Sequence, residues 1–250
     1  MNGQAAQADP SMESEPLMEV MLRPVRAHHG FEGCFEQLAT AIRLGVYPKG
    51  STLPPERELA ARMGVSRATL REAIAALRTA GLLQSVRGRG GGTRVLALPE
   101  IVPTSPPDLG ERREELLDSL VFRRVVEAGA CHVAASRPLS DKQRTMLRAA
   151  LADVARAQGR RAHRQADSRL HLGIATLTGS PHIIDAVTRS QADLHTLLTA
   201  IPVLSVNIEH SDAQHEAIVR AIIAGDPSRA RRSMEQHCDD TAALLRGLLG

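Results

Sequence analysis

The sequence predicts a mostly α-helical protein, with an N-terminal winged helix-turn-helix followed by a C-terminal antiparallel all-α bundle of six or seven helices. Residues 53–95 contain two short helical patterns joined by a tight turn, then a hairpin with a glycine-rich tip. Four prolines within residues 99–107 separate this stretch from the rest, because proline fits neither a helix interior nor a central strand. Apolar residues then recur at helical spacing through most of residues 111–250.

Composition limits the class of protein. The 250 residues suffice for two domains, and their hydrophobic content of 43% includes only 2% aromatics. Single-stranded nucleic-acid binders stack bases on aromatic side chains, so this composition disfavours that class. The three cysteines are widely spaced, and the sequence has neither an apolar run of transmembrane length nor a signal-peptide pattern. We therefore expect a reduced, cytoplasmic protein without membrane association.

The charge is distributed unevenly along the chain. Residues 40–98 carry ten Lys and Arg against three Glu, whereas residues 1–39 carry two Arg against six acidic residues. Residues 99–250 are balanced, with 19 residues of each sign. A basic segment beside a neutral one predicts that the basic segment binds a polyanion.

These patterns divide the chain into four parts. Residues 1–28 are polar, acidic and interrupted by proline, which indicates a flexible tail. The winged helix-turn-helix is expected over residues 29–98 and a Pro-rich linker over residues 99–110. Residues 111–250 are expected to form the helical domain, with breaks near residues 138–140, 159, 179–181, 202–205 and 225–227.

The winged helix-turn-helix is expected to contain three helices and a hairpin. Gly64 should end the second helix and Ser66 should cap the third, while residues 82–86 and 93–98 are suited to strands. The expected core residues recur every three or four positions: Phe35, Leu38, Ala39 and Ile42 in the first helix, Leu59, Ala60 and Met63 in the second, and Leu70, Ile74 and Leu77 in the third.

The third helix has the features of a DNA recognition helix. Arg67 and Arg71 lie on the face opposite its core residues, with Ser66 and Thr69 near the helix start. The first residues of a recognition helix meet base edges in the major groove, where arginine can bond guanine through two atoms. Arg57, on the preceding helix, would reach a phosphate or a neighbouring base. A solvated helix face is the alternative, but the helix-turn-helix spacing and the wing favour DNA.

The glycine-rich tip allows a second interpretation, a phosphate-binding loop for a dinucleotide. However, Gly88 and Gly90 precede a strand, so no helix N-terminus would receive the phosphate. A hairpin tip flanked by Arg87, Arg89 and Arg94 is better suited to a DNA groove or backbone.

The helical domain contains a candidate metal site. Asp167 and His171 are four residues apart and share one helix face. The turn between the last two helices is centred on Asp226, 11 residues after His215 and 11 before His237, so an antiparallel pair brings both imidazoles to the same height. Three imidazoles and one carboxylate suit a divalent transition metal, with zinc expected first and nickel or manganese as alternatives. The other seven histidines are expected at the surface or at helix caps.

The N-terminal segment LPPERELAARMGVSRATLREAIAALRTAGLL, followed by a G-x-G wing, resembles the DNA-binding domain of GntR-family bacterial transcription regulators over about residues 35–96. Ala68 stands where some relatives carry a hydroxyl residue, which removes one expected DNA contact. The resemblance assigns DNA contact to Arg57, Arg67 and Arg71, supported by Ser66, Thr69 and the wing residues Arg87 and Gly88.

The segments VFRRVVEAGACHVAASR, DSRLH and HEAIVRAIIAGD resemble the ligand-binding domain, called FCD, of the FadR-type branch of that family over about residues 112–248. The resemblance implies that the metal helps to hold a small carboxylate effector. The metal ligands that it implies are Asp167, His171, His215 and His237.

The same resemblance points to a residue for the effector. Arg123 matches the arginine of the family's first long helix and is expected to bind the effector carboxylate through its planar guanidinium. Pairing with Glu127, four residues later, is the alternative role for Arg123. Ser180 stands where relatives often carry Asn, and it can cap the following helix.

Taken together, the sequence predicts a homodimeric, sequence-specific DNA-binding regulator, expected to be a repressor, and not an enzyme. Its expected partners are palindromic double-stranded operator DNA and a small carboxylate effector bound at the metal site. The alternatives are a metal-free regulator of the same family that senses an acyl-thioester, a metal-dependent hydrolase and a nonspecific nucleoid-type protein. Protein ligands would nearly fill the coordination sphere of the metal, which disfavours the hydrolase. The neutral helical domain adds nothing to nonspecific DNA binding, which disfavours the nucleoid-type protein.

Overall fold

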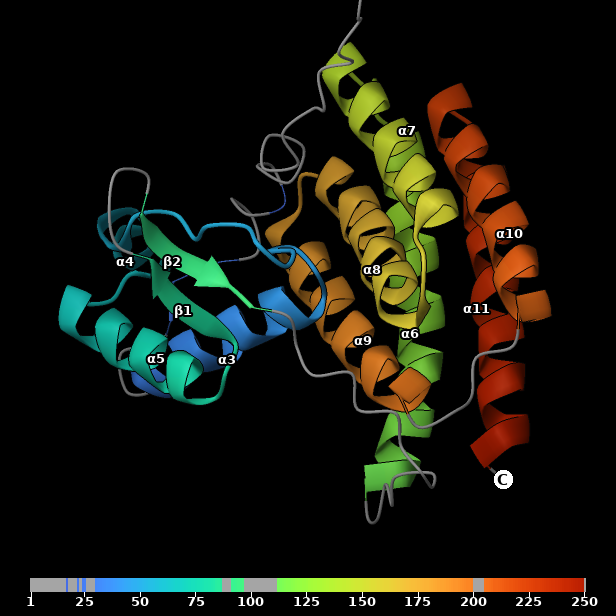
Figure 1. The fold of residues 1–250 in the computed structure, drawn as a ribbon. Helices are drawn as coiled ribbons and strands as arrows, with labels where there is room; N and C mark the ends of the chain where they lie inside the picture. Colours follow the sequence, from blue (N-terminus) through green and yellow to red (C-terminus); the bar gives the residue numbers. More distant parts are fainter. Residues whose placement is uncertain are drawn as a thin grey trace, which may run out of the picture.

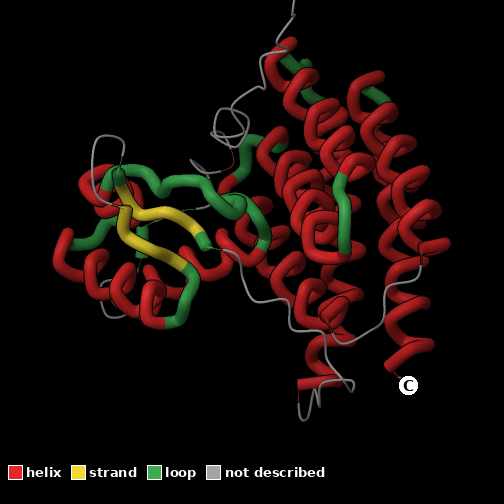
Figure 2. Tube along the Cα trace, viewed as in Figure 1, coloured by secondary structure: helices red, strands yellow, loops and turns green. Residues whose placement is uncertain are grey.

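The computed structural model describes residues 17, 22, 24, 25, 30–86, 91–96, 112–199 and 205–249. Over these residues a small domain with one two-stranded sheet lies beside a larger bundle of helices (Figures 1 and 2). The predicted fold class, a winged helix-turn-helix followed by an all-helical domain, is confirmed. The linker predicted over residues 99–110 lies outside the described residues, as does most of the tail predicted over residues 1–28.

The small domain follows the predicted order of elements. They are α3 (Gly30–Arg43), α4 (Glu56–Met63), α5 (Arg67–Thr79), β1 (Leu83–Val86) and β2 (Gly92–Val95). The two strands are antiparallel, with Leu83 opposite Val95. The chain before α4 adds to this sheet, because the Leu53 amide donates to the Thr93 carbonyl at 2.8 Å.

The tight turn between α4 and α5 depends on two residues. Gly64 has a φ of +64°, the left-handed conformation that glycine adopts without steric cost, and its amide bonds carbonyls in the last turn of α4. The Ser66 hydroxyl then accepts the Thr69 amide at 3.0 Å and caps α5. Of the ten predicted core residues, Phe35 is half-buried and the other nine are buried.

The larger domain contains six helices within the described ranges. They are α6 (Arg112–Ala135), α7 (Asp141–Arg156), α8 (Arg160–Leu177), α9 (Pro181–Thr199), α10 (Ser205–Ala224) and α11 (Pro227–Leu249). The breaks predicted near residues 138–140, 159, 179–181 and 225–227 coincide with helix boundaries, whereas residues 202–204 of the remaining break lie outside the described residues. Helix α6 packs against α8, α9, α10 and α11, so its inward side chains lie at the centre of the bundle.

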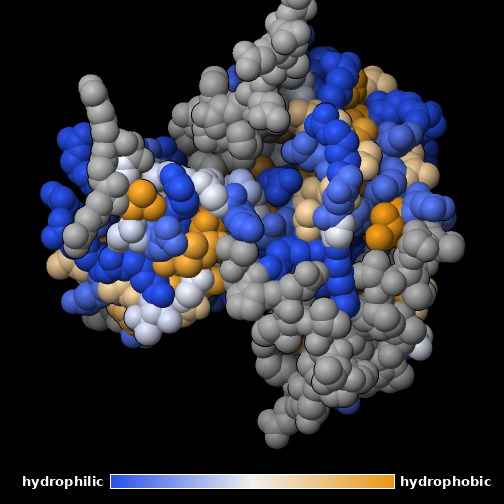
Figure 3. All heavy atoms as spheres, viewed as in Figure 1, coloured by the Kyte–Doolittle hydropathy of each residue, from blue (hydrophilic) through white to orange (hydrophobic). Residues whose placement is uncertain are grey.

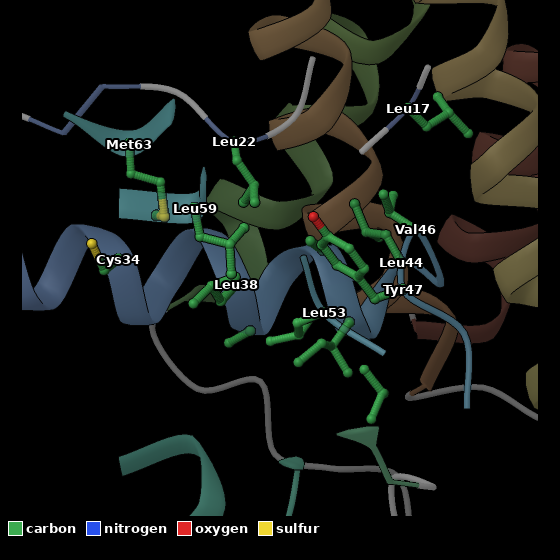
Figure 4. Close-up of a cluster of buried hydrophobic side chains, with 14 of the residues drawn as sticks. Leu17, Leu22, Cys34, Leu38, Leu44, Val46, Tyr47, Leu53, Leu59 and Met63 are labelled. Carbon is green, nitrogen blue, oxygen red and sulfur yellow. The ribbon is translucent and has the colours of Figure 1, made fainter. Parts of the chain in front are cut away.

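The two domains share one buried hydrophobic cluster. It includes Leu44, Val46 and Tyr47, which follow α3, together with Leu172 of α8 and Ile184 of α9. Figure 4 shows the three residues that follow α3 beside helices of the bundle. The small domain is therefore packed directly on the helical domain.

Helix α8 also makes polar contacts with the end of α3. The Gln165 amide donates to the carbonyls of Ile42 and Arg43, both at 3.3 Å. The Arg169 guanidinium donates to the Gly45 carbonyl at 3.4 Å. Carbonyls at a helix C-terminus lack partners within the helix, and these donors bind there, with the Ile42 carbonyl also accepting the Gly45 amide at 3.1 Å.

Leu17 and Leu22, from the segment predicted to be a tail, are buried in the same cluster, and the Val25 amide donates to the Met63 carbonyl at 2.8 Å.

On the face seen in Figure 3, hydrophobic side chains (orange) lie in small groups among hydrophilic ones (blue). No helix among the described residues combines the length and apolar character needed to span a membrane.

Candidate functional site

The exposed face of α5 presents the predicted DNA-binding arginines. Arg67 and Arg71 are exposed on this helix, and Arg57 is exposed on α4. The Nε of Arg71 lies 2.7 Å from a carboxylate oxygen of Glu56, at the start of α4, in an ion pair that sequence reasoning did not identify. The pair holds Arg71 beside α4, and any anion that binds this arginine must compete with Glu56.

Ser66 and Thr69 fix the start of the same helix. Their hydroxyl oxygens lie 2.8 Å apart, and Ser66 also accepts the Thr69 amide. These contacts orient the first turn of α5, so the two hydroxyls already have a structural role beside any contact with DNA.

The wing is described only at its base. Arg87 and Gly88, predicted to contact DNA, lie outside the described residues. At the base, Arg94 is exposed on β2, and the Arg78 guanidinium donates to the Ser85 hydroxyl at 2.7 Å. The latter bond ties α5 to β1 and sets the position of the wing relative to the recognition helix.

The four predicted metal ligands come together in the bundle. Asp167 and His171 lie on α8, His215 on α10 and His237 on α11, with one ligand atom of each within 4.8 Å of all the others. The imidazole rings of His215 and His237 have centroids 4.6 Å apart, as the symmetric spacing around Asp226 predicts. All three histidines are buried and Asp167 is nearly so.

Two of the separations between these atoms are those of ligands around one transition metal, while His171 Nε2 and Asp167 Oδ1 lie further apart, at 3.9 Å. The Nε2 of His215 lies 3.2 Å from Asp167 Oδ1 and 3.3 Å from His171 Nε2. Two donor atoms bound at about 2.0–2.1 Å to one tetrahedral ion lie about 3.3–3.4 Å apart. Imidazole nitrogens with a carboxylate oxygen are also a donor set that zinc and similar ions prefer.

Electrostatics within the cluster favour a cation. Burial alone would raise the pKa of Asp167, but a hydrogen bond from His215 and the neighbouring histidines hold it well below its usual range. Burial, together with His215 and Arg123, lowers the pKa of His237 well below its ordinary value. The site thus holds an ionised carboxylate and a neutral imidazole, the forms that bind metals.

The outer nitrogens of the three imidazoles have different surroundings. His171 Nδ1 lies 2.5 Å from Glu127 Oε2, and His237 Nδ1 lies 3.1 Å from the amide oxygen of Gln214. His215 Nδ1 is buried and has no hydrogen-bond partner in the described part of the chain. Among the described residues, a carboxylate therefore lies beside the outer nitrogen of His171 but not beside those of His215 and His237.

Arg123, the predicted effector residue, is buried directly beside this cluster. Its Nε lies 3.3 Å from Glu127 Oε1, so the pairing foreseen as the alternative does occur. Among the residues that are described, however, Nε makes this ion pair without a hydrogen bond, and Nη1 has no hydrogen-bond partner. A buried guanidinium nitrogen without a partner can bind a further acceptor, as a carboxylate effector would require.

Several functional contacts were missed by sequence reasoning. Glu127 was considered only as a partner of Arg123, and its contact with His171 spans 44 residues. The bonds from Gln165 and Arg169 to the end of α3 span more than 120 residues. Neither the spacing nor the residue type indicates such contacts. Gln214 is an exception: it directly precedes His215, so a contact with His237 could have been expected once His215 and His237 are placed side by side.

Comparison with known families agrees with this architecture. Residues 32–95 match the bacterial regulatory proteins of the gntR family, and residues 118–240 match the FCD domain. The chain belongs to the GntR family. Within that family it has the FadR-type arrangement, a winged helix-turn-helix followed by an FCD domain.

Its relatives are transcription regulators. The regulator RmpR of Mycobacterium gastri is 30% identical over 235 residues, which cover 89% of this chain and 82% of the relative. The L-lactate dehydrogenase operon regulatory protein of Escherichia coli K12 is 32% identical over 209 residues, 75% of each chain. The Exu regulon transcriptional regulator of the same strain is 27% identical over 224 residues, 84% of each chain.

A solved structure supports the fold. Escherichia coli McbR/YncC superposes with a TM-score of 0.54 at 17% identity, covering 87% of this chain and 97% of that one. At this identity the likeness concerns the fold alone. The family and the named relatives identify the chain as a DNA-binding transcription regulator rather than an enzyme, so the hydrolase alternative is wrong.

Proposed function

We propose that this GntR-family regulator binds palindromic operator DNA as a homodimer, and that a small carboxylate effector at a divalent-metal centre controls its affinity for the operator. We further propose that it acts as a repressor in the cytoplasm. Its membership of the family supplies the DNA-binding function. The control by metal and effector is argued from the residues of the bundle.

On the DNA side, the first two turns of α5 would enter the major groove. Arg67 and Arg71 would contact base edges and Arg57 a phosphate or a neighbouring base, with the wing residues Arg87 and Gly88 beside the adjacent groove. The exposure of the three helix arginines supports these roles. Glu56 would release Arg71 when the arginine binds DNA.

In the bundle, the metal would be held by Asp167, His171, His215 and His237. When bound, the metal supplies a positive centre to which an effector carboxylate can coordinate. The guanidinium of Arg123 would bind a second oxygen of the effector, because its Nη1 is buried without a partner among the described groups. The two positive groups would select a small anion over a neutral ligand.

The name of one relative suggests where to begin with effectors. The Escherichia coli protein named for the L-lactate dehydrogenase operon is 32% identical over three quarters of each chain. A small hydroxycarboxylate has an oxygen for the metal and a carboxylate for Arg123. We therefore propose this chemical class for the first tests.

A homodimer is supported by an exposed apolar stripe on α6. Val121, Phe122 and Val125 are exposed by 53%, 40% and 66%, which is unusual for large apolar side chains. A second copy of the chain would cover this stripe, and its two-fold symmetry would match the two halves of a palindrome. Replacement of Val125 by Glu is expected to shift the purified protein from dimer to monomer in light-scattering measurements.

The observation that carries the proposal is the double role of α8. Its inner face supplies Asp167 and His171 to the cluster, while Gln165 and Arg169 bind the carbonyls at the end of α3. A ligand that shifts α8 would thereby shift the DNA-binding domain. Coupling between two sites is typically about 1–3 kcal/mol, or about 5–150-fold in affinity.

The test begins with metal content and proceeds to DNA. Elemental analysis of the purified full chain should find about one metal per subunit, retained by the His182→Ala variant and lost by His215→Ala. His182 is an exposed histidine of α9 and controls for the substitution itself. Operator DNA selected from random sequence is then titrated by gel shift with and without acetate, L-lactate, succinate and citrate.

We expect a symmetric operator and a change of at least fivefold in affinity with one of these acids, provided that metal is present. Loss of the effect in His215→Ala but not in His182→Ala would support the proposal. A wild-type protein that stays metal-free after reconstitution would contradict it and favour the metal-free alternative of the same family.

A further inference from the structure

The carboxylate of Glu127 is the most highly connected polar group near the metal centre. One oxygen, Oε2, lies 2.5 Å from His171 Nδ1. The other, Oε1, accepts the Ser190 hydroxyl at 3.0 Å and the Gln191 amide at 2.9 Å, and lies 3.3 Å from Arg123 Nε. The donors come from α6, α8 and α9, so three helices fix the position of this carboxylate.

Every group in this network is buried. Glu127, Arg123 and Gln191 are each at most 2% exposed, and water therefore does not compete with their contacts. The hydroxyl of Ser190 and the amide nitrogen of Gln191 both donate to Glu127, and the Arg123 guanidinium lies beside it, so the carboxyl group is surrounded by donors and acts as a hydrogen-bond acceptor.

These contacts determine which nitrogen of His171 bears a proton. Because Glu127 acts as the acceptor, the short contact places the proton on His171 Nδ1. In the neutral ring Nε2 then carries the lone pair, and this atom lies 3.3 Å from His215 Nε2 and 3.9 Å from Asp167 Oδ1. His171 is thus prepared to use Nε2 as a ligand atom.

We propose that Glu127 is a positioning residue of the metal centre, fixing the tautomer and ring orientation of His171 and increasing the basicity of its ligand nitrogen. The proposal rests on the metal centre proposed above and adds a residue that does not touch the metal. Carboxylates that accept the outer N–H of a metal-bound histidine typically change metal affinity by about 10- to 100-fold.

The other two histidines provide an internal comparison. His237 is oriented by the neutral amide of Gln214, and His215 Nδ1 has no partner in the described ranges of the chain. A carboxylate polarises an imidazole more strongly than an amide does. Removal of the Glu127 charge should therefore weaken the centre more than replacement of Gln214 by Ala.

The experiment measures metal binding by the full chain after removal of bound metal with a chelator. Cobalt(II) is titrated while its visible absorption is followed, with a competing chelator to measure tight affinities. Glu127→Gln removes the charge at constant size. Glu127→Asp keeps the charge that balances Arg123 but withdraws the carboxylate by one methylene, so this variant carries the test if Glu127→Gln does not fold.

The matched control is Asp239→Asn on α11. Asp239 is a carboxylate that pairs with Arg124 at 2.7 Å, but it is about half exposed and takes no part in the cluster. We expect cobalt affinity to fall about 10- to 100-fold in Glu127→Gln, to fall less in Glu127→Asp, and to stay within twofold of wild type in Asp239→Asn. Nitrogen-15 spectra of the metal-free protein should show a weaker Nδ1–H preference at His171 in the Glu127 variants, because an amide or a withdrawn carboxylate accepts this proton less strongly, while His237 keeps its own preference.

The outcomes separate this proposal from the one on which it rests. If wild type binds cobalt and both Glu127 variants bind it within twofold of wild type, Glu127 has no positioning role and the metal centre stands. Folded Glu127 variants whose His171 tautomer is unchanged would also overturn the positioning role. If wild type binds no cobalt, the metal centre fails and Glu127 has no ligand to position.

Discussion

The two functional regions of this protein use charged side chains in opposite ways. In the DNA-binding domain, Arg57, Arg67 and Arg71 are exposed on two short helices. In the bundle, Arg123 and Glu127 are almost completely buried and contact each other. Exposed ion pairs contribute little to stability because water screens them. A buried charge instead needs an opposite charge or hydrogen-bond partners nearby, because water no longer solvates it.

This difference indicates how each region can respond to a ligand. In the proposed complex, DNA would replace Glu56, the one ion-pair partner of Arg71 among the described residues, without disturbing the core, because that pair lies at the surface. A ligand in the bundle instead meets groups that already constrain one another across α6, α8 and α9. A change there moves helices, which is what a signal from the bundle to the DNA-binding domain requires.

The largest expected effect follows from breaking the buried pair. Replacement of Arg123 by Met leaves the Glu127 carboxylate buried without its main counter-charge, and such changes typically destabilise a protein by about 3–5 kcal/mol. The neighbouring Arg124 pairs with Asp239 at the surface, where water screens the pair, so Arg124→Met should change the stability much less than Arg123→Met does. Urea unfolding of both metal-free variants measures the difference.

Equal stability of the Arg123→Met and Arg124→Met variants would show that burial does not distinguish the two pairs. The contrast between the two regions would then concern exposure alone and not energetics.

A second effect depends on pH. Burial, with Arg164, Arg43 and Arg161 nearby, lowers the pKa of His195 from 6.5 to about 4. As pH falls from 6.5 to 4, His195 becomes protonated in the unfolded chain but stays neutral in the folded chain. The free energy of unfolding therefore decreases within this window. The loss attributable to His195 is at most about 3 kcal/mol, at 1.4 kcal/mol for each pH unit.

The measurement compares wild type with His195→Gln in urea at pH 7 and pH 4.5. The variant should lose less stability on acidification than wild type does, and the exposed His182→Gln should behave like wild type. Identical acid sensitivity of all three proteins would show that His195 does not contribute to the loss of stability at low pH.

A third, smaller effect concerns DNA affinity. Arg71→Ala is expected to weaken operator binding by about 1–3 kcal/mol for each half-site contact, with little change in stability. Arg229→Ala removes the same charge from an exposed position on α11 and serves as the control. Gel shifts with the selected operator give both values, and unchanged affinity of Arg71→Ala would reject this recognition face.

The smallest expected effect sharpens the role of Glu56. Because this carboxylate lies 2.7 Å from Arg71 Nε, Glu56→Gln releases the arginine and removes a negative charge near the DNA phosphates. Operator affinity should rise by about 0.5–1 kcal/mol, roughly two- to fivefold, the scale of one exposed ion pair. Weaker binding by this variant would mean that Glu56 holds Arg71 in its DNA-binding orientation.

Local patterns accounted for most of the fold. The helices of the small domain could be predicted because apolar spacing is a local property, and because Gly64 and Ser66 mark the turn between α4 and α5. The meeting of His215 and His237 could be predicted as well, because one antiparallel turn relates them. The pairing of α8 with the later helices rested on the family resemblance.

The remaining features depend on contacts that sequence spacing does not encode. His195 was expected at the surface or at a helix cap, but it is mostly buried among arginines from α3 and α8. The contacts of Glu127 with Ser190 and Gln191 arise only once α9 packs against α6. Such contacts follow from tertiary packing, which a periodic pattern does not specify.

The junction between α8 and α3 bears on the engineering of new regulators. A DNA-binding domain grafted onto a foreign bundle would lose the donors that Gln165 and Arg169 supply to it. The part of this regulator that could be transferred to another bundle is therefore residues 30–96 together with the face of α8 that carries Gln165 and Arg169. A biosensor for a different signal would exchange the groups around Asp167 and retain that face.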